Sequence, residues 1–114
     1  MINKILLDSA NEIEKIDFYN WSEKLILNKL KNYEVSEIFL NYSFLIKNSV
    51  RFKKLKVLEY LLKLGKENNF NFSRYKYLNL EFFLDSNSLN LLKKVNFPIN
   101  EKILNQFNKD LKGL

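Results

Sequence analysis

Apolar residues recur about every 3.6 positions along most of this chain, which is the spacing of one face of an α-helix. Strict alternation of apolar and polar residues, the pattern of a half-buried strand, is confined to residues 70–72 and 75–77. The pattern therefore predicts an all-α protein, a compact array or bundle of about six to seven short helices in one domain spanning residues 1–114. Because an amphipathic helix must bury its apolar side, we expect these helices to pack against one another.

The first two helices are expected in the first quarter of the chain. Spaced isoleucines and leucines between residues 2 and 16 predict an amphipathic helix that ends near Asp17. Asn20 stands three residues before a glutamate and is a suitable N-cap for a second helix that runs to about Asn32. The side chains of this second helix that we expect to point inward are Leu25, Ile26 and Leu30.

The third helix is predicted to begin near Val35 and to carry apolar residues on two sides. One stripe follows Val35, Ile38 and Tyr42, while Leu40 and Phe44 project roughly opposite to it. Two apolar sides indicate a helix that lies between two neighbours.

The fourth helix is predicted to begin at Asn48 or Ser49 and to end at Gly65. Glycine adopts the left-handed backbone conformation readily, and so it is well placed just after the end of a helix. Leucines and a valine cover about half of the circumference of this helix. We therefore expect it to be central in the fold.

The last part of the chain is expected to form three further helices. Ser73 can cap a fifth helix over residues 77–84, which Asp85 and the two residues after it stop. A short sixth helix follows over residues 88–95, and a last one begins after Asn100. The apolar residues of this last helix are Ile103, Leu104, Phe107 and Leu111.

The second half of the chain has a weak internal repeat. The leucine pair Leu61-Leu62 precedes a glycine and an asparagine, and the pair Leu91-Leu92 comes 30 residues later and precedes Asn100. This half resembles the helix pairs of ankyrin-type repeats, although the Thr-Pro-Leu-His opening of that family is absent. The resemblance implies helical hairpins that bind proteins. Any other array of helical hairpins would give a similar leucine spacing.

Composition narrows the chemistry further. The chain has no histidine and no cysteine, which removes the usual zinc ligands, the commonest general base, thiol nucleophiles and disulfides. No glycine-rich phosphate loop and no stretch long enough to span a bilayer is present. We therefore expect a cytoplasmic protein that is not an enzyme and that has no metal or other cofactor. Acidic residues such as Glu12, Glu14 and Asp17 are expected to be solvated rather than catalytic.

The net charge of +6 resides in one segment. Residues 51–76 carry eight basic side chains and two glutamates, whereas acidic and basic residues balance in the rest of the chain. The lysines of the fourth helix project onto one side, opposite its leucines, which predicts a basic strip for an acidic protein or for nucleic-acid phosphate. Alternatively, these lysines only solvate the helix, with Glu59 and Lys63 paired four residues apart.

A binding site is predicted from this segment. Aromatic residues mostly belong to the core, and we expect this of Trp21, but Phe70 and Phe72 follow a run of asparagines and are expected to be exposed. With only two arginines and no recognised nucleic-acid motif, a protein partner is favoured over nucleic acid. Such a protein is a small inhibitor, immunity factor or adaptor, the class that includes phage-encoded inhibitors of host defence. The predicted partner-binding residues are Arg51, Lys53, Lys56, Tyr60, Lys63, Lys66, Phe70, Phe72, Arg74 and Lys76.

Overall fold

The computed structural model describes residues 12–75, 78, 80 and 83–99. Every regular element in this part of the chain is helical, and the prediction of an all-α fold is confirmed for it. A helical turn at residues 12–14 comes first. It is followed by α2 (Glu23–Leu30), α3 (Val35–Leu40), α4 (Tyr42–Arg51), α5 (Leu55–Glu67), the 3₁₀-helix η1 (Phe72–Tyr75) and α6 (Ser86–Lys94).

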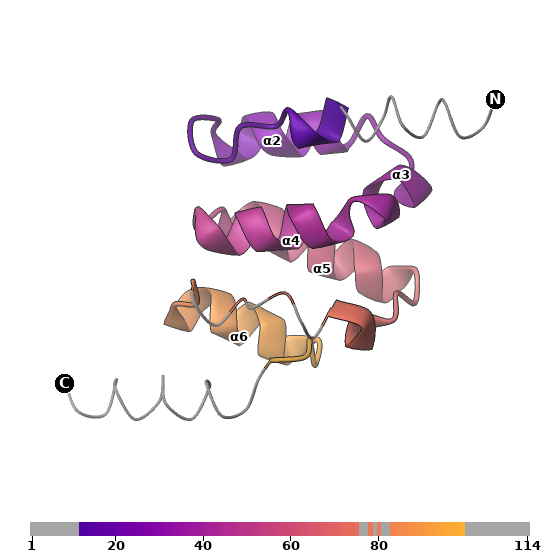
Figure 1. The fold of residues 1–114 in the computed structure, drawn as a ribbon, viewed down its shortest axis with the longest axis vertical. Coiled ribbons are helices and arrows are strands. Elements are labelled where there is room, and N and C mark those ends of the chain that lie inside the picture. The colour runs from indigo at the N-terminus through magenta and orange to yellow at the C-terminus, as the bar shows by residue number, and fades with distance from the viewer. Residues whose placement is uncertain (1–11, 76–77, 79, 81–82, 100–114) are drawn as a thin grey trace.

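Helix α5 is the central element, as predicted. It contacts α2, α4 and α6. It runs antiparallel to α4, while α2, α5 and α6 run in the same direction across the molecule (Figure 1). Burying one Val or Leu side chain contributes ~1.5–3 kcal/mol, so a helix buried on one whole side anchors its neighbours. The buried residues of α5 are Val57, Leu58, Leu61, Leu62 and Gly65.

Helix α2 begins later than predicted because Ser22, and not Asn20, caps it. The Ser22 hydroxyl accepts a hydrogen bond from the Leu25 N–H at 3.1 Å. Asn20 belongs to the preceding loop, where its backbone N–H and its side-chain amide donate to the Asp17 carboxylate at 2.9 and 2.7 Å. These hydrogen bonds from Asn20 lower the pKa of Asp17, and they use the asparagine that was expected to start the helix.

Two side chains that were predicted to lie inward are exposed. Leu25 is 48% exposed and Leu40 is 62% exposed. Leu40 is the last residue of α3, and Asn41 separates this helix from α4. Because the helix is interrupted there, the apolar residues before and after Asn41 do not form one continuous stripe. Phe44 is half-buried, and its ring packs edge-on against Phe18 with centroids 6.0 Å apart. The other two inward positions predicted for α2, Ile26 and Leu30, are buried.

The predicted boundary between the third and fourth helices is wrong. Asn48 and Ser49 lie inside α4, where their side chains donate to the carbonyl groups four residues earlier at 2.8 and 2.6 Å. Because these bonds satisfy both polar side chains within the helix, neither residue needs to start a new one. Helix α4 ends at Arg51, after which Lys53 adopts a left-handed conformation with φ of 56°.

The predicted role of Gly65 as the residue that ends α5 is also wrong. Gly65 lies inside the helix, is buried and has no positive φ. The left-handed residue is Asn69, with φ of 57°. The Phe70 N–H then donates to the Gly65 carbonyl, five residues earlier, at 2.9 Å. The Schellman motif closes a helix with two hydrogen bonds, and this is the one that spans more residues.

Helix α6 begins two residues earlier than predicted because Asp85 starts this helix. The Asp85 carboxylate accepts from the Ser88 N–H at 2.8 Å, and the Ser88 hydroxyl accepts from the Asp85 N–H at 3.1 Å. This reciprocal pair is a capping box. The helix ends like α5, with left-handed Asn96 followed by Phe97, which is buried.

The remaining predictions concern the fifth helix and the two ends of the chain. Ser73 does not cap an α-helix but lies within η1, where the Asn71 side chain accepts from its N–H at 3.2 Å. Much of the predicted fifth helix over residues 77–84 lies outside the described residues. The same holds for the start of the first helix and for the last helix after Asn100. In the described end of the first helix, Ile13 and Ile16 are buried, as the pattern predicts.

Candidate functional site

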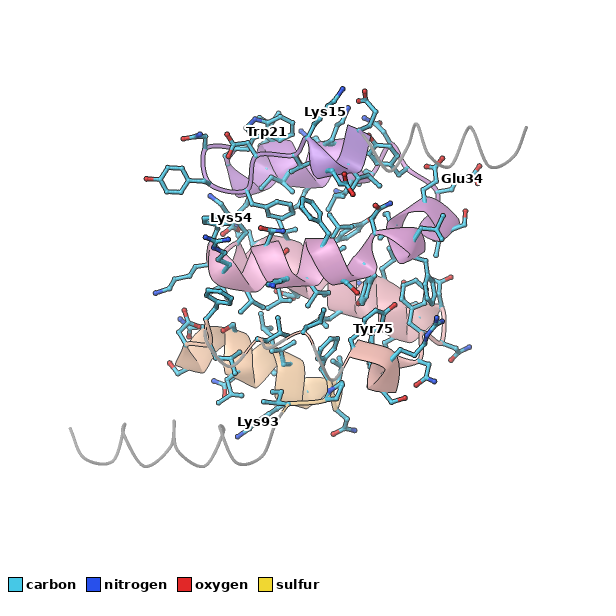
Figure 2. All side chains as sticks on the ribbon, in the orientation of Figure 1. Lys15, Trp21, Glu34, Lys54, Tyr75 and Lys93 are labelled. Carbon is cyan, nitrogen blue, oxygen red and sulfur yellow. The ribbon has the colours of Figure 1, made fainter. Side chains whose placement is uncertain are left out.

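The basic segment 51–76 does not form one continuous patch in the structure. Arg51 and Lys53 lie at the C-terminal end of α4 and just after it, whereas Arg74 belongs to η1 near the other end of the molecule (Figure 1). Basic side chains also extend from several other parts of the surface (Figure 2). Lys76 lies outside the described residues. The predicted basic residues that share helix α5 are Lys56, Lys63 and Lys66.

Arg51 and Lys53 are engaged within the chain. The guanidinium group of Arg51 lies over the rings of Phe52 and Phe83, at 5.1 and 5.7 Å from their centroids. The ammonium group of Lys53 lies 3.9 Å from a carboxylate oxygen of Asp85. These contacts join the end of α4 to the start of α6. Both cations therefore have a structural role that the linear charge pattern does not reveal.

Arg74 lies at a separate surface depression. This groove has a volume of about 330 Å³ and is lined by Phe39, Leu40, Ser43, Arg74 and Tyr75. Of its described lining residues, Arg74 is the one cation, and Leu40 is exposed. Arg74 is thus not part of the surface formed by the lysines of α5.

The predicted exposure of Phe70 and Phe72 is wrong. Phe70 is only 7% exposed, and its ring stands edge-on to Tyr42 with centroids 5.1 Å apart. Phe72 is half-buried, and its ring lies 5.3 Å from that of Phe97. The reason is the left-handed turn at Asn69, which folds the chain back over the end of α5, where an apolar contact commonly accompanies this turn.

Tyr60, the remaining aromatic residue of the predicted site, and other aromatic residues near it also pack against the core. Tyr60 is half-buried and packs against the buried cluster, as does Trp21. Tyr75 lies 5.3 Å from Tyr42 between ring centroids, on the inner side of η1 (Figure 2). Burial raises the pKa of Tyr42 and of Tyr75, so neither phenol is activated as a base near neutral pH.

Lysines from three helices converge beside α5. A groove of about 370 Å³ between α2 and α5 is lined by Lys24, Lys31 and Lys56, together with Glu23. The groove on the other flank of α5, next to α6, has a volume of about 400 Å³. The charged residues that line this second groove are Glu59, Lys63, Lys66, Glu67 and Lys94.

The two grooves flank α5, and each has a lysine of this helix in its lining. Lys56 and Lys63 are seven residues apart on α5, which is two helical turns or about 10 Å along the axis, so their side chains project from one side. We call this surface the lysine face. It comprises six lysines and three glutamates: Lys24, Lys31, Lys56, Lys63, Lys66, Lys94, Glu23, Glu59 and Glu67.

Among the described residues, none of these lysines has a carboxylate within ion-pair distance. The ion pairs among the described residues involve other lysines: Lys15 and Lys29 approach Glu12 at 4.0 and 3.3 Å, and Lys53 approaches Asp85. The pairing of Glu59 with Lys63 that would have supported a purely solvating role does not form in this part of the chain. With six lysines and three glutamates, the lysine face carries a net positive charge.

The acidic residues noted in the sequence have structural partners. The Glu12 carboxylate accepts a hydrogen bond from Lys29, which raises the pKa of that lysine. Glu34 and Glu37 form the capping box of α3, in which the Glu37 carboxylate accepts from the Glu34 N–H at 3.0 Å. Within residues 12–99, where described, no group of three or more Asp, Glu, His or Cys residues could hold a metal ion.

Three members of the lysine face were missed by the sequence analysis, namely Lys24, Lys31 and Lys94. They come from α2 and α6, in parts of the chain where acidic and basic residues balance. A window of linear charge cannot find them, because only the parallel packing of α2 and α6 on either side of α5 brings them together. The sequence did contain one indication of their exposure, because each of these lysines stands at a helical spacing from leucines that are buried.

Across the described helices, none is long and apolar enough to cross a membrane. The ankyrin-type resemblance of the second half stays a prediction, because comparison with protein-family models, curated proteins and solved structures gives no match to this chain.

Proposed function

We propose that this protein is a non-enzymatic interaction module whose lysine face binds an acidic surface of a partner protein in the cytoplasm. The observation that carries the proposal is the convergence of six exposed lysines from α2, α5 and α6 around two grooves, without an ion pair to any of them within the described residues. A net charge of one sign accelerates and orients association with a partner of the opposite sign. Small inhibitors, immunity factors and adaptors work by this kind of contact.

The composition of the face favours a protein over nucleic acid. Glu23, Glu59 and Glu67 lie among the lysines, and each would repel a continuous phosphate backbone. The groove between α5 and α6 is also lined by Leu62, Leu91 and Val95, and such apolar residues suit the side chains of a protein. Both described arginines, Arg51 and Arg74, lie outside the face, although Arg is the side chain best suited to phosphate.

The test is affinity capture from the native host with the wild-type chain and with the double variant Lys56→Glu, Lys63→Glu. We expect one or more acidic proteins to be captured by the wild type and lost from the variant. The matched control is Lys15→Glu with Lys47→Glu, which makes the same change in charge at exposed positions outside both grooves. Circular dichroism should show equal helix content in all three proteins.

Two results would contradict the proposal. One is capture that survives charge reversal on the lysine face but is lost with the control variant. The other is capture that disappears after nuclease treatment, together with a mobility shift of arbitrary DNA or RNA that weakens steeply with salt. The second result would instead establish the same surface as a nucleic-acid interface.

A further inference from the structure

The groove between α5 and α6 differs from its neighbour in its apolar base. Leu62 of α5, Leu91 of α6 and Val95, which directly follows α6, line it, whereas Leu27 is the one apolar residue among the described lining of the groove between α2 and α5. Leu91 and Val95 are half-buried, so part of each side chain is accessible to solvent. The volume of about 400 Å³ lies at the small end of the range for binding pockets. It suits a few apolar side chains of a larger partner.

Cations stand on both walls of this groove. Lys63 and Lys66 belong to the α5 wall and Lys94 to the α6 wall, and all three are exposed. Glu59 and Glu67 lie on the α5 wall, and the charged side chain that the described part of α6 contributes to the groove is Lys94. A partner with aliphatic residues in its middle and carboxylates on both flanks would meet a lysine on each side.

The two helices that line this groove also restrict the backbone conformation of a segment that binds in it. Both are helices whose backbone N–H and C=O groups are already paired within α5 and α6, away from their ends. An extended peptide would find no backbone partners there and would leave its own polar groups unsatisfied. A helix satisfies its backbone internally and can place a ridge of side chains in a groove between two helices.

We infer that the α5–α6 groove receives an acidic amphipathic helix of the partner, with aliphatic residues one turn apart on its contact face and Asp or Glu on both flanks. This inference rests on the proposed function and specifies which part of the lysine face determines partner recognition. The groove between α2 and α5 supplies peripheral charge.

The probe is a fluorescein-labelled helical peptide of about five turns with leucines along one face and glutamates on both flanks. Its matched control has the same composition, with the leucines distributed around the helix. Fluorescence anisotropy with the full chain should show binding of the first peptide, and the control should bind at least about tenfold more weakly because its anchors cannot enter the groove together.

Variants locate the contact. Lys63→Gln with Lys94→Gln should weaken peptide binding about tenfold, whereas Lys24→Gln with Lys31→Gln should change it less than about twofold. These neutral substitutions at exposed positions leave the apolar base of the groove and the buried core unchanged. Thermal unfolding of both variants within a few degrees of the wild type would show that the folds are comparable.

Equal binding of the two peptides would overturn the inference, since it would mean that charge alone is recognised. The proposal of an acidic partner would survive that result. Equal weakening by both pairs of variants would also overturn the α5–α6 assignment. If neither peptide binds while acidic proteins are still captured through the lysine face, the helical partner is wrong and the proposed function is unaffected. If capture also fails, both are wrong.

Discussion

The hydroxyl oxygen of Tyr42 lies 2.7 Å from the position that a Cβ atom on Gly65 would occupy. The same hydroxyl donates a 2.7 Å hydrogen bond to the carbonyl of Leu61, one turn earlier on α5. A side chain at position 65 would occupy the space through which the Tyr42 hydroxyl reaches the Leu61 carbonyl. Gly65 therefore stands inside a helix because Tyr42 of α4 must reach the backbone of α5.

The first prediction is that Gly65→Ala destabilises the protein by up to about 2 kcal/mol. Alanine favours a helix over glycine by about 1 kcal/mol, but the new methyl group would also lie 2.8 Å from the Phe72 ring, and overpacking typically costs about 1–3 kcal/mol. Urea unfolding followed by circular dichroism measures the change.

In a double-mutant cycle with Tyr42→Phe, the loss should be less than additive, because the second change removes one of the two clashes. A Gly65→Ala variant more stable than the wild type would contradict this account.

The second prediction concerns alkaline pH. Burial raises the pKa of Tyr42 above its ordinary value of 10.0. The unfolded chain therefore loses the phenolic proton first, so this stabilisation is present below pH 10 and is lost as pH rises toward the folded pKa. Each pH unit in that window should cost about 1.4 kcal/mol. The unfolding free energy of wild type should fall more steeply above pH 10 than that of Tyr42→Phe, whereas parallel curves would contradict the assignment. Burial also raises the pKa of Tyr75. The comparison of wild type with Tyr42→Phe removes the contribution of Tyr75 and of other groups that both proteins share.

The helical fold and the central place of α5 could be predicted because they follow from the spacing of apolar residues, which is a local property. Helix boundaries could not be predicted as well, since several polar residues can cap and only one does. Asn20 and Asn48 are good caps in isolation, but hydrogen bonds to Asp17 and to the Phe44 carbonyl use their side chains elsewhere.

The candidate site was only partly predictable. Lys56 and Lys63 were found because one helix carries them at a regular spacing, and Lys66 was found from the net charge of residues 51–76, although the helix was expected to end at Gly65. Lys24, Lys31 and Lys94 depend on how separate helices pack, which a charge count along the chain does not contain. Phe70 was expected to be exposed in a binding loop because asparagines precede it. In the structure one of those asparagines is the left-handed residue that directs Phe70 into the core.

The third prediction tests the start of α6. Asp85→Ala should destabilise the protein by about 1 kcal/mol through loss of the N-cap, while Asp85→Asn keeps a cap and should cost less. Partial burial alone would raise the pKa of Asp85, but hydrogen bonds from Ser88 and the charge of Lys53 outweigh it and lower the pKa below 3.8.

The charge of Asp85 therefore stabilises the fold above about pH 4 and is lost as pH falls through the lowered pKa. The difference in unfolding free energy between wild type and Asp85→Asn should shrink between neutral pH and pH values below that pKa. A difference that stays constant over this range would show that the carboxylate charge is not involved.

The fourth prediction separates core from surface aromatic residues. Phe70→Ala should destabilise the protein by about 3–5 kcal/mol, as expected for removing a buried aromatic ring. Tyr19→Ala is the matched control, since Tyr19 is 73% exposed, and surface substitutions usually change stability by less than about 0.5 kcal/mol. Chemical denaturation of the two variants gives both values. Equal, small effects would place Phe70 at the surface after all.

The fifth prediction distinguishes a surface defined by folding from one defined by sequence. If the lysine face binds the partner, removal of charge at Arg51 and Arg74 should leave partner capture unchanged, because both residues lie outside the two grooves. Lys63→Gln with Lys66→Gln removes the same charge within the face and should weaken capture about tenfold or more. Quantitative pull-down with the captured partner compares these two double variants.

Because Arg51 lies over Phe52 and Phe83, Arg51→Gln also needs an unfolding curve as a control for lost packing. Equal weakening by both pairs, with both proteins folded, would return the binding site to the continuous segment 51–76 and would argue against the three-helix surface.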